Sequence, residues 1–370
     1  NILRKIREKN MKMEKMAGNL NNIVQPLLEW YRDNRRQLPW RDQNNAYYTW
    51  VSEIMLQQTR VEAVKPYFKR FIGELPDIQA LAACPEEKLM KLWEGLGYYN
   101  RVRNMQLAAQ TVVSAYGGKL PASYKQLLEL KGIGNYTAGA IASIAYQIPV
   151  PAVDGNVLRV LSRITEDRQD IMKQSVRRQA EEKLQEVIPQ ECPGDFNQAM
   201  MELGAVVCVP NGPARCEGCP IAKFCLAYQH GTVEELPVKA PKKQRSLENR
   251  TVLVIQDGEK TVIQKRPKKG LLAGLYELPN LGGHLSRDEV LAEVERMQLE
   301  PLYIEKLPDA KHVFSHIEWR MTGYRIRVAS LDTDREMPFI FAEKKQSERQ
   351  YAIPSAFRAY VKYMKEESEK

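Results

Sequence analysis

The sequence predicts two unequal domains, an all-α domain over residues 18–236 and an α+β domain over residues 251–366. Apolar residues recur three and four apart through most of the first region, which is the period of an amphipathic helix. A connector at 237–250 follows, with two prolines and several basic residues. Beyond it, short β-branched runs flank an Asp257-Gly258 turn and predict a hairpin.

Composition and charge suit a globular protein that meets a polyanion. The 370 residues are 44% hydrophobic and 27% charged, with a net charge of +9. Residues 101–163 hold seven lysines and arginines against two acids, as expected of a surface that faces a nucleic-acid backbone, and a merely solubilising charge pattern is the alternative. No apolar run is long enough to span a membrane, and residues 1–17 form a basic tail without the apolar core of a signal peptide. We therefore expect a cytoplasmic protein in a reducing compartment, and a monomer.

Two acids stand beside predicted helices. In a predicted helix over 50–60, Glu53 shares a face with Gln57 and Arg60, which on the residues alone is a solvated polar stripe. Asp154 directly precedes a periodic apolar run, so its expected role is a helix N-cap. The helix N-terminus should keep its carboxylate ionised, as a group that faces a developing cation must be.

A glycine-flexed turn at residues 95–103 presents tyrosines beside arginines. Tyr98 and Tyr99 precede Arg101 and Arg103, and rings beside cations suit nucleic-acid bases beside phosphates. The alternative is that both tyrosines are core residues with satisfied hydroxyls.

Residues 123–146 have the pattern of a helix–hairpin–helix. A short helix capped by Ser123 ends at the turn Gly132-Ile133-Gly134, and a second helix begins near Asn135. Such a turn exposes backbone N–H groups beside a helix N-terminus, which is a natural phosphate site. A plain αα-hairpin is the alternative, and the basic surroundings favour DNA.

Four cysteines crowd into eighteen residues with gaps of seven, two and five. They are Cys208, Cys216, Cys219 and Cys225. The gaps lack the paired knuckles of zinc ribbons, so we favour a [4Fe–4S] cluster over zinc. The remaining alternatives are two local disulfides or four unligated buried thiols, and both need a coincidence of spacing in a chain without a secretory signal. Cys84 and Cys192 stand apart and are expected to be ordinary half-buried residues.

The second domain is predicted as strands with one helix at 286–297, where Ser286 and Glu289 form a capping box. Further strands are expected at 302–306, 317–330 and 339–341.

Together these motifs resemble the helix–hairpin–helix, iron–sulfur DNA glycosylases of the endonuclease III superfamily, and most closely the adenine DNA glycosylase (MutY) family. The resemblance spans nearly the whole chain. It rests on Leu38-Pro-Trp-Arg41, Trp50-Val-Ser-Glu-Ile-Met-Leu-Gln-Gln-Thr59, Gly95-Leu-Gly-Tyr-Tyr99, Lys131-Gly-Ile-Gly-Asn-Tyr136, Val153-Asp-Gly-Asn-Val157 and the cysteine cluster.

The resemblance implies a division of catalytic work. Glu53 would protonate the departing adenine and Asp154 would stabilise the sugar cation, with Tyr136 and Asn156 as their supports. Bifunctional relatives carry a lysine at the position of Tyr136, so we expect a monofunctional enzyme that leaves an abasic site.

The implied partner is duplex DNA with adenine opposite 8-oxoguanine or guanine. The base must leave the stack, with Tyr98 as a wedge and Gln58 filling in nearby. Arg41 and Gln198 would contact adenine, and Gly132 and Gly134 a phosphate.

The second domain resembles the Nudix-like (MutT-like) domain of the same family. Its loop Phe314-Ser315-His316 would read 8-oxoguanine, by stacking and by a hydroxyl hydrogen bond. On the residues alone, Val313 and Phe314 predict strand core, with Ser315 and His316 facing solvent. The Arg-Glu-x2-Glu-Glu pattern is missing from 282–300, so pyrophosphate hydrolysis is not expected.

The first cysteine gap departs from the family, since many members have six residues there; a Pro- and Gly-rich loop should absorb the extra residue. Two other functions stay open. One is a thymine or uracil mismatch glycosylase of the same superfamily, which the Phe314-Ser315-His316 loop disfavours. The other is a non-catalytic iron–sulfur DNA-binding protein, which intact Glu53, Asp154 and Tyr136 disfavour.

Overall fold

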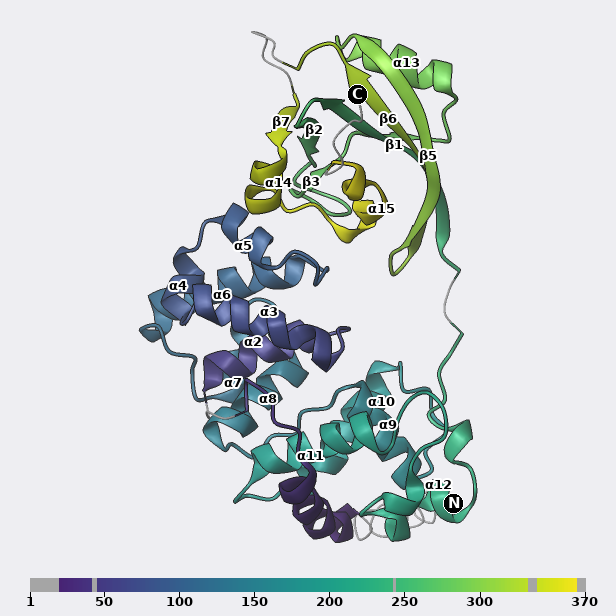
Figure 1. Ribbon diagram of the computed structural model, residues 1–370. Helices are drawn as coiled ribbons and strands as arrows, with labels where there is room; N and C mark the ends of the chain where they lie inside the picture. The colour runs from purple at the N-terminus through teal and green to yellow at the C-terminus, as the bar shows by residue number, and fades with distance from the viewer. Residues whose placement is uncertain (1–19, 42–44, 242–243, 332–337, 365–370) are drawn as a thin grey trace, which may run out of the picture. The chain divides into compact units, whose positions relative to one another are not determined.

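The computed structural model describes residues 20–41, 45–241, 244–331 and 338–364, so the predicted tail at 1–17 lies outside the described residues. The chain forms two compact units (Figure 1). Unit 1 comprises Asn1–Ala83 and Arg103–Pro241, and unit 2 comprises Cys84–Val102 and Lys242–Lys370. Unit 2 therefore includes a segment from the middle of the region that the sequence assigns to the helical domain.

Unit 1 is helical, as predicted. Its first described helix covers residues 20–34. The others are α2 (Ala46–Leu56), α3 (Val61–Glu74), α4 (Ile78–Ala83), most of α6 (Asn100–Tyr116), α7 (Tyr124–Glu129), α8 (Asn135–Tyr146), α9 (Gly155–Ile164), α10 (Gln174–Gln185), α11 (Pro193–Val206) and α12 (Leu226–Gln229), with 3₁₀ turns η1 (Cys216–Gly218), η2 (Ala222–Phe224) and η3 (Val233–Glu235).

Helix α8 is the centre of unit 1, because both α2 and α11 pack against it. Its run of small residues permits this close approach. A Cβ added to Gly194 on α11 would lie 2.7 Å from the backbone oxygen of Ser143 on α8, and one added to Gly139 would lie 2.4 Å from that of Pro151. Helix α11 also packs on α9, so three segments that carry predicted site residues are held together.

Unit 2 is built on one mixed sheet with the order β3-β2-β1-β6-β5, in which β4 also pairs with β1 and β7 with β2. The strands are β1 (Ser246–Asp257), β2 (Lys260–Lys265), β3 (Tyr276–Glu277), β4 (Asn280–Gly282), β5 (Pro301–Val313), β6 (Ile317–Val328) and β7 (Ile340–Glu343). The predicted hairpin is confirmed, with Asp257 opposite Lys260. The centre is a parallel ladder of β1 and β6, from Ser246 beside Ile317 to Gln256 beside Arg327.

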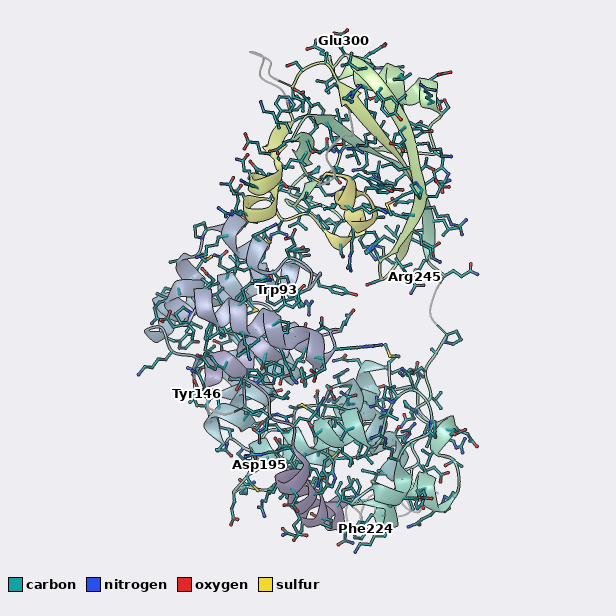
Figure 2. The ribbon with its side chains drawn as sticks, in the orientation of Figure 1. Trp93, Tyr146, Asp195, Phe224, Arg245 and Glu300 are labelled. Carbon is teal, nitrogen blue, oxygen red and sulfur yellow. The ribbon has the colours of Figure 1, made fainter. Side chains whose placement is uncertain are left out.

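Helices cover both faces of this sheet. Helix α13 (Arg287–Arg296) begins with the predicted Ser286–Glu289 capping box and buries Val290 and Val294 against one face. The other face packs on the C-terminal turns, where Phe357 and Tyr360 meet the sheet. These turns are α14 (Lys344–Gln350), η4 (Ser355–Phe357), α15 (Arg358–Val361) and η5 (Lys362–Met364). In Figure 2, Glu300 and Arg245 mark opposite ends of the sheet.

The segment Cys84–Val102, with helix α5 (Glu86–Leu92), joins unit 2 through polar contacts. Glu87 accepts a hydrogen bond from the Tyr276 hydroxyl at 2.7 Å. The Lys91 ammonium donates to the Tyr351 carbonyl at 3.0 Å, and Glu94 accepts from the Ile353 amide at 2.8 Å.

Two sequence-based expectations need correction. Helix α2 ends at Leu56, and Arg60 is already the N-cap of α3, so Glu53 and Arg60 do not share a helix face. Strand β1 begins at Ser246, so residues 246–250, expected in the connector, belong to the sheet because they pair with β6. No helix in the described part of the chain has the length and hydropathy needed to cross a bilayer.

Candidate active site

Glu53 is a buried acid on α2, not the solvated residue that its spacing alone predicts. Only 7% of the residue is exposed, among the apolar side chains that α2 packs on α8. The Tyr136 hydroxyl on α8 donates a short hydrogen bond to its Oε2 and also lies 3.7 Å from the Met201 sulfur on α11. Burial raises the pKa of Glu53 to about 7, the nearby Asp154 charge adds to this, and Tyr136 and Arg41 oppose it.

Asp154 has the predicted N-cap position before α9. Its Oδ1 accepts the Val157 amide at 2.7 Å and its Oδ2 accepts the Asn156 side-chain amide at 2.9 Å. Burial nevertheless raises the pKa of Asp154, against the lowering effect of these hydrogen bonds. Desolvation outweighs the hydrogen bonds of the cap in this shift, and an ionised Asp154 stays a prediction.

The Asn156 side chain is fixed at its other end. Its Oδ1 accepts a bond from Arg159 at 2.9 Å, and Arg159 also donates to the carbonyls of Gly204 at 2.7 Å and Cys208 at 2.9 Å. A Cβ at Gly204 would stand 2.7 Å from that of Asn156, so only glycine leaves room for the amide here. Asp154 thus stands at the end of a chain of ordered side chains.

Three further predicted contacts lie in unit 1. Arg41, 14% exposed, donates to the buried Glu202 carboxylate on α11 at 2.8 Å and to the Arg36 carbonyl at 3.1 Å. Gln198 is half-buried on the same helix. Gln58 is exposed in the turn after α2, with a left-handed φ of 62°.

The helix–hairpin–helix of α7 and α8 is confirmed. Ser123 is the N-cap of α7, and α8 begins at Asn135 after the glycine turn. Gly132 has a φ of +81°, and a Cβ there would lie 2.7 Å from that of Asn104, whereas a Cβ at Gly134 would meet open space. Both glycines are exposed, as a turn that approaches a phosphate backbone requires.

In unit 2, Phe314-Ser315-His316 is the loop between β5 and β6. The Phe314 ring is half-buried edge-on to Trp319, with 4.9 Å between ring centroids, while Ser315 and His316 are exposed. Val313, predicted as strand core, is 43% exposed instead, because it lies at the protruding end of the hairpin. The Arg245 guanidinium donates to the Phe314 carbonyl at 3.1 Å.

The segment Cys84–Val102 brings a further predicted contact to this loop. Tyr98 is 49% exposed with a left-handed φ of 47°, and its hydroxyl lies 3.1 Å from that of Ser315. The Arg101 guanidinium lies 5.1 Å from its ring centroid. Tyr99 is buried. The exposed Tyr98 therefore fits the prediction of a nucleic-acid contact, and Tyr99 fits the alternative of a core residue.

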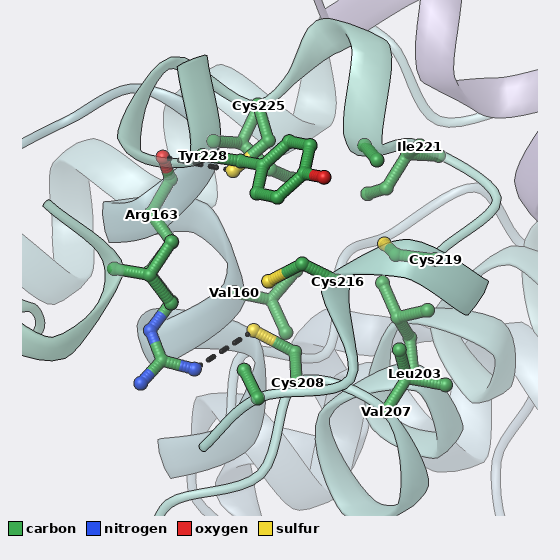
Figure 3. Close-up of a pocket in the computed structure, with 14 residues that line it drawn as sticks. Val160, Arg163, Leu203, Val207, Cys208, Cys216, Cys219, Ile221, Cys225 and Tyr228 are labelled. Atoms are coloured by element: carbon green, nitrogen blue, oxygen red, sulfur yellow. Dashed lines mark hydrogen bonds between the residues drawn. The ribbon is translucent and has the colours of Figure 1, made fainter. Parts of the chain in front are cut away.

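The four clustered cysteines line one pocket beside α9 (Figure 3). None forms a disulfide. The Cys208 sulfur accepts a hydrogen bond from Arg163 at 3.1 Å, and the Cys225 thiol donates to the Arg163 carbonyl at 3.3 Å. Burial raises the pKa of the Cys219 thiol to about 12. Within the described ranges, no three His, Cys, Asp or Glu side chains lie close enough together to hold a single metal ion.

Sequence reasoning missed two residues of this site. Arg159 is hidden in the periodic apolar run of α9, where nothing marks it as buried. Glu202 left a signal, since it is an acid amid apolar and small residues at 199–206.

Comparisons with known proteins agree with this arrangement. Residues 51–189 match the HhH-GPD superfamily of base excision DNA repair proteins, and residues 251–363 match the NUDIX domain. A thermostable thymine-DNA glycosylase is similar in structure, with a TM-score of 0.51 and 27% identity over 58% of this chain and 98% of that chain. An endonuclease III in a DNA complex, 24% identical with a TM-score of 0.50, shares the fold. The chain therefore combines a domain of the HhH-GPD superfamily of base excision DNA repair proteins with a NUDIX domain.

Similarity over most of the chain identifies the family more closely. The adenine DNA glycosylase of Mus musculus is 36% identical over 358 residues, which cover 81% of this chain and 69% of the mouse protein. That of Buchnera aphidicola subsp. Baizongia pistaciae is 32% identical over 80% of this chain and 83% of its own length. The chain belongs to the adenine DNA glycosylase family.

Proposed function

We propose that this protein hydrolyses the bond between adenine and its deoxyribose, where adenine stands opposite 8-oxoguanine or guanine in duplex DNA. The main observation in support is the buried carboxyl group of Glu53, which lies in a domain of a base excision DNA repair superfamily. Burial raises the pKa of this carboxyl to about 7. The names of the relatives support adenine as the base.

Glu53 acts as the general acid. Adenine leaves poorly as an anion, so protonation of a ring nitrogen weakens the glycosidic bond. A carboxyl with a pKa of about 7 carries its proton in half of the molecules at neutral pH. Tyr136, whose pKa burial raises well above 10, remains a donor and keeps the Glu53 carboxyl in place.

Asp154 stabilises the sugar as it gains oxocarbenium character, and water then completes the hydrolysis. The Asn156 amide and the Val157 amide hold both of its oxygens, so the carboxylate does not have to reorient during the reaction. The residue at the position of the strand-cutting lysine is Tyr136, which cannot form a Schiff base. The product is an abasic site in an uncut strand.

Recognition of the partner base falls to unit 2. Phe314, Ser315 and His316 offer a half-buried ring, a hydroxyl and an imidazole at the end of the β5–β6 hairpin, and Tyr98 offers an exposed ring beside Ser315. An aromatic wedge and hydrogen-bonding groups are what reading a base in a distorted duplex requires.

The four cysteines would hold a [4Fe–4S] cluster. They converge on one pocket and form no disulfide. Their gaps of seven, two and five residues lack the paired Cys-x2-Cys knuckles of zinc ribbons, which favours a cluster of several irons over a single zinc ion. A bound cluster supplies a cross-link that fixes the loop against α9.

The cofactor proposal is tested by iron and acid-labile sulfide analysis. We expect about four irons per chain, and their loss in Cys216→Ser but not in Cys84→Ser. Stoichiometric zinc without sulfide would contradict it.

The activity is tested with duplexes that hold labelled adenine, thymine or uracil opposite 8-oxoguanine or guanine. Strand cleavage that requires hot alkali, and occurs only at adenine, is the expected result. Release of thymine would instead favour the activity named for the structural relative. Tight binding without any abasic product would favour a non-catalytic DNA-binding protein.

A further inference from the structure

Glu202 is a buried acid on α11 that takes no part in the proposed proton transfer or in stabilising the sugar cation. Its side chain is 1% exposed, and its two oxygens face two arginines from the segment before α2. Arg36 donates to Oε1 at 2.5 Å and to Oε2 at 3.1 Å, and Arg41 donates to Oε2 at 2.8 Å. The Arg36 backbone amide adds a fourth bond at 3.3 Å.

This arrangement keeps Glu202 ionised. Burial alone would raise the pKa of its carboxyl, but the bonds and charges of Arg36 and Arg41 outweigh burial and lower it. A buried ion pair adds little net stability, because desolvation offsets most of its attraction. The contribution of Glu202 therefore lies in where it holds the arginine side chains.

Arg41 is the partner with a link to the catalytic acid. Its guanidinium also donates a hydrogen bond to the Arg36 carbonyl, and it lies 5.7 Å from the centroid of the Tyr31 ring. Its charge opposes the rise in the pKa of Glu53.

The other titratable groups that act on Glu53 are Tyr136 from α8 and Asp154 from the start of α9. Helix α3 also packs on α2, and none of its charged side chains is among the groups that act on Glu53. The Glu202 carboxylate accepts a hydrogen bond of 2.8 Å from Arg41, so a change at Glu202 reaches Glu53 through the position of the Arg41 guanidinium.

We propose that Glu202 is a positioning residue for adenine excision, which anchors the Arg41 guanidinium through a buried hydrogen bond so that the charge of Arg41 acts on Glu53. The inference rests on the proposed function.

The test is the pH dependence of single-turnover adenine excision in Glu202→Gln. The amide keeps the shape of the side chain but turns one N–H group toward a guanidinium, which releases Arg41. Glu53 then holds its proton more tightly. We expect the alkaline limb of the profile to move up by about half a pH unit or more, and the plateau rate to fall several-fold.

A double-mutant cycle shows whether Arg41 carries the effect. In the Arg41→Gln background, Glu202→Gln should move the limb no further. Glu202→Asp, which keeps the charge, should restore the limb toward that of the unaltered protein and serves also if Glu202→Gln folds poorly.

An unmoved limb in Glu202→Gln, with only a lower melting temperature, would reduce Glu202 to a structural ion pair and overturn the proposal. A downward shift would overturn it too, because Arg41 would then have stayed in place. Failure of the unaltered protein to excise adenine would instead reject the proposed function, so the two failures are distinguishable.

Discussion

Tyr136 donates its hydroxyl hydrogen to the carboxyl of Glu53, and each group comes from a different buried helix of unit 1. The bond favours the ionised carboxylate, while burial favours the neutral acid. The opposition of these two effects leaves a carboxyl that titrates near neutrality, which is the property that the proposed reaction uses.

Replacing Glu53 by glutamine should abolish excision and preserve binding. Glutamine fills the same space and accepts the Tyr136 hydrogen bond, but it has no proton to give. We expect the single-turnover rate to fall by about 10²–10⁴-fold, with affinity for the mispaired duplex unchanged in a gel-shift assay. Glu62→Gln, on the exposed surface of α3, is the matched control. Residual excision near the original rate would remove Glu53 from the acid role.

The excision rate should fall as pH rises through about 7, where Glu53 loses its proton. Tyr136→Phe removes a hydrogen bond that favours the ionised form, so the pKa of Glu53 rises and the decline moves to higher pH. Rate profiles between pH 5.5 and pH 9.5, taken at saturating enzyme, measure both values. A Tyr136→Phe profile shifted toward acid would contradict the assigned direction.

Glu53→Gln should also stabilise the protein in a pH-dependent way. Because burial raises the pKa of Glu53 from 4.5 to about 7, its ionisation destabilises the fold increasingly between these values and fully above them. The variant should gain on the order of 3 kcal/mol over the unaltered protein at pH 8, and little at pH 4.5. Denaturant unfolding at the two pH values tests this; an equal gain at both would point to packing instead.

Gly204→Ala should impair excision without touching a catalytic group. The new methyl would lie 2.7 Å from the Asn156 Cβ and displace the amide that holds Asp154. We expect at least a tenfold slower single-turnover rate, with duplex binding retained. Gly73→Ala, where a Cβ meets nothing within 4 Å, should leave the rate unchanged.

Ser315→Ala should lower the preference for 8-oxoguanine over guanine as the partner base. The exposed hydroxyl at the β5–β6 loop is lost, while unit 1 is unaltered. We expect excision opposite 8-oxoguanine to slow several-fold and excision opposite guanine to stay nearly constant. An equal loss on both duplexes would assign Ser315 to general DNA binding.

Local signals in the sequence predicted local structure well. The Ser286–Glu289 capping box, the Asp257-Gly258 hairpin and the Asp154 cap depend on residues a few positions apart, and all three are present. The spacing of apolar residues could not predict that α2 ends at Leu56, because the apolar period marks the buried face of a helix and not its last residue.

Long-range features escaped prediction. The burial of Glu53 depends on α8, more than eighty positions away, and the parallel pairing of β1 with β6 depends on a register that no short motif records. The bonds of Glu202 to Arg36 and Arg41 span over 160 positions. The resemblance supplied Glu53, Asp154 and the cysteines as a set, but it named neither Glu202 nor Arg159.

Because Cys84–Val102 belongs to unit 2, two stretches of the chain that are far apart in sequence are expected to evolve together. Glu87, Lys91 and Glu94 meet partners that lie beyond residue 264. Recombination that exchanged only the chain after residue 241 for another NUDIX domain would replace one side of these contacts and keep the other. The two stretches are therefore expected to change together as lineages diverge, and a grafted second domain should bring its own version of residues 84–102 with it.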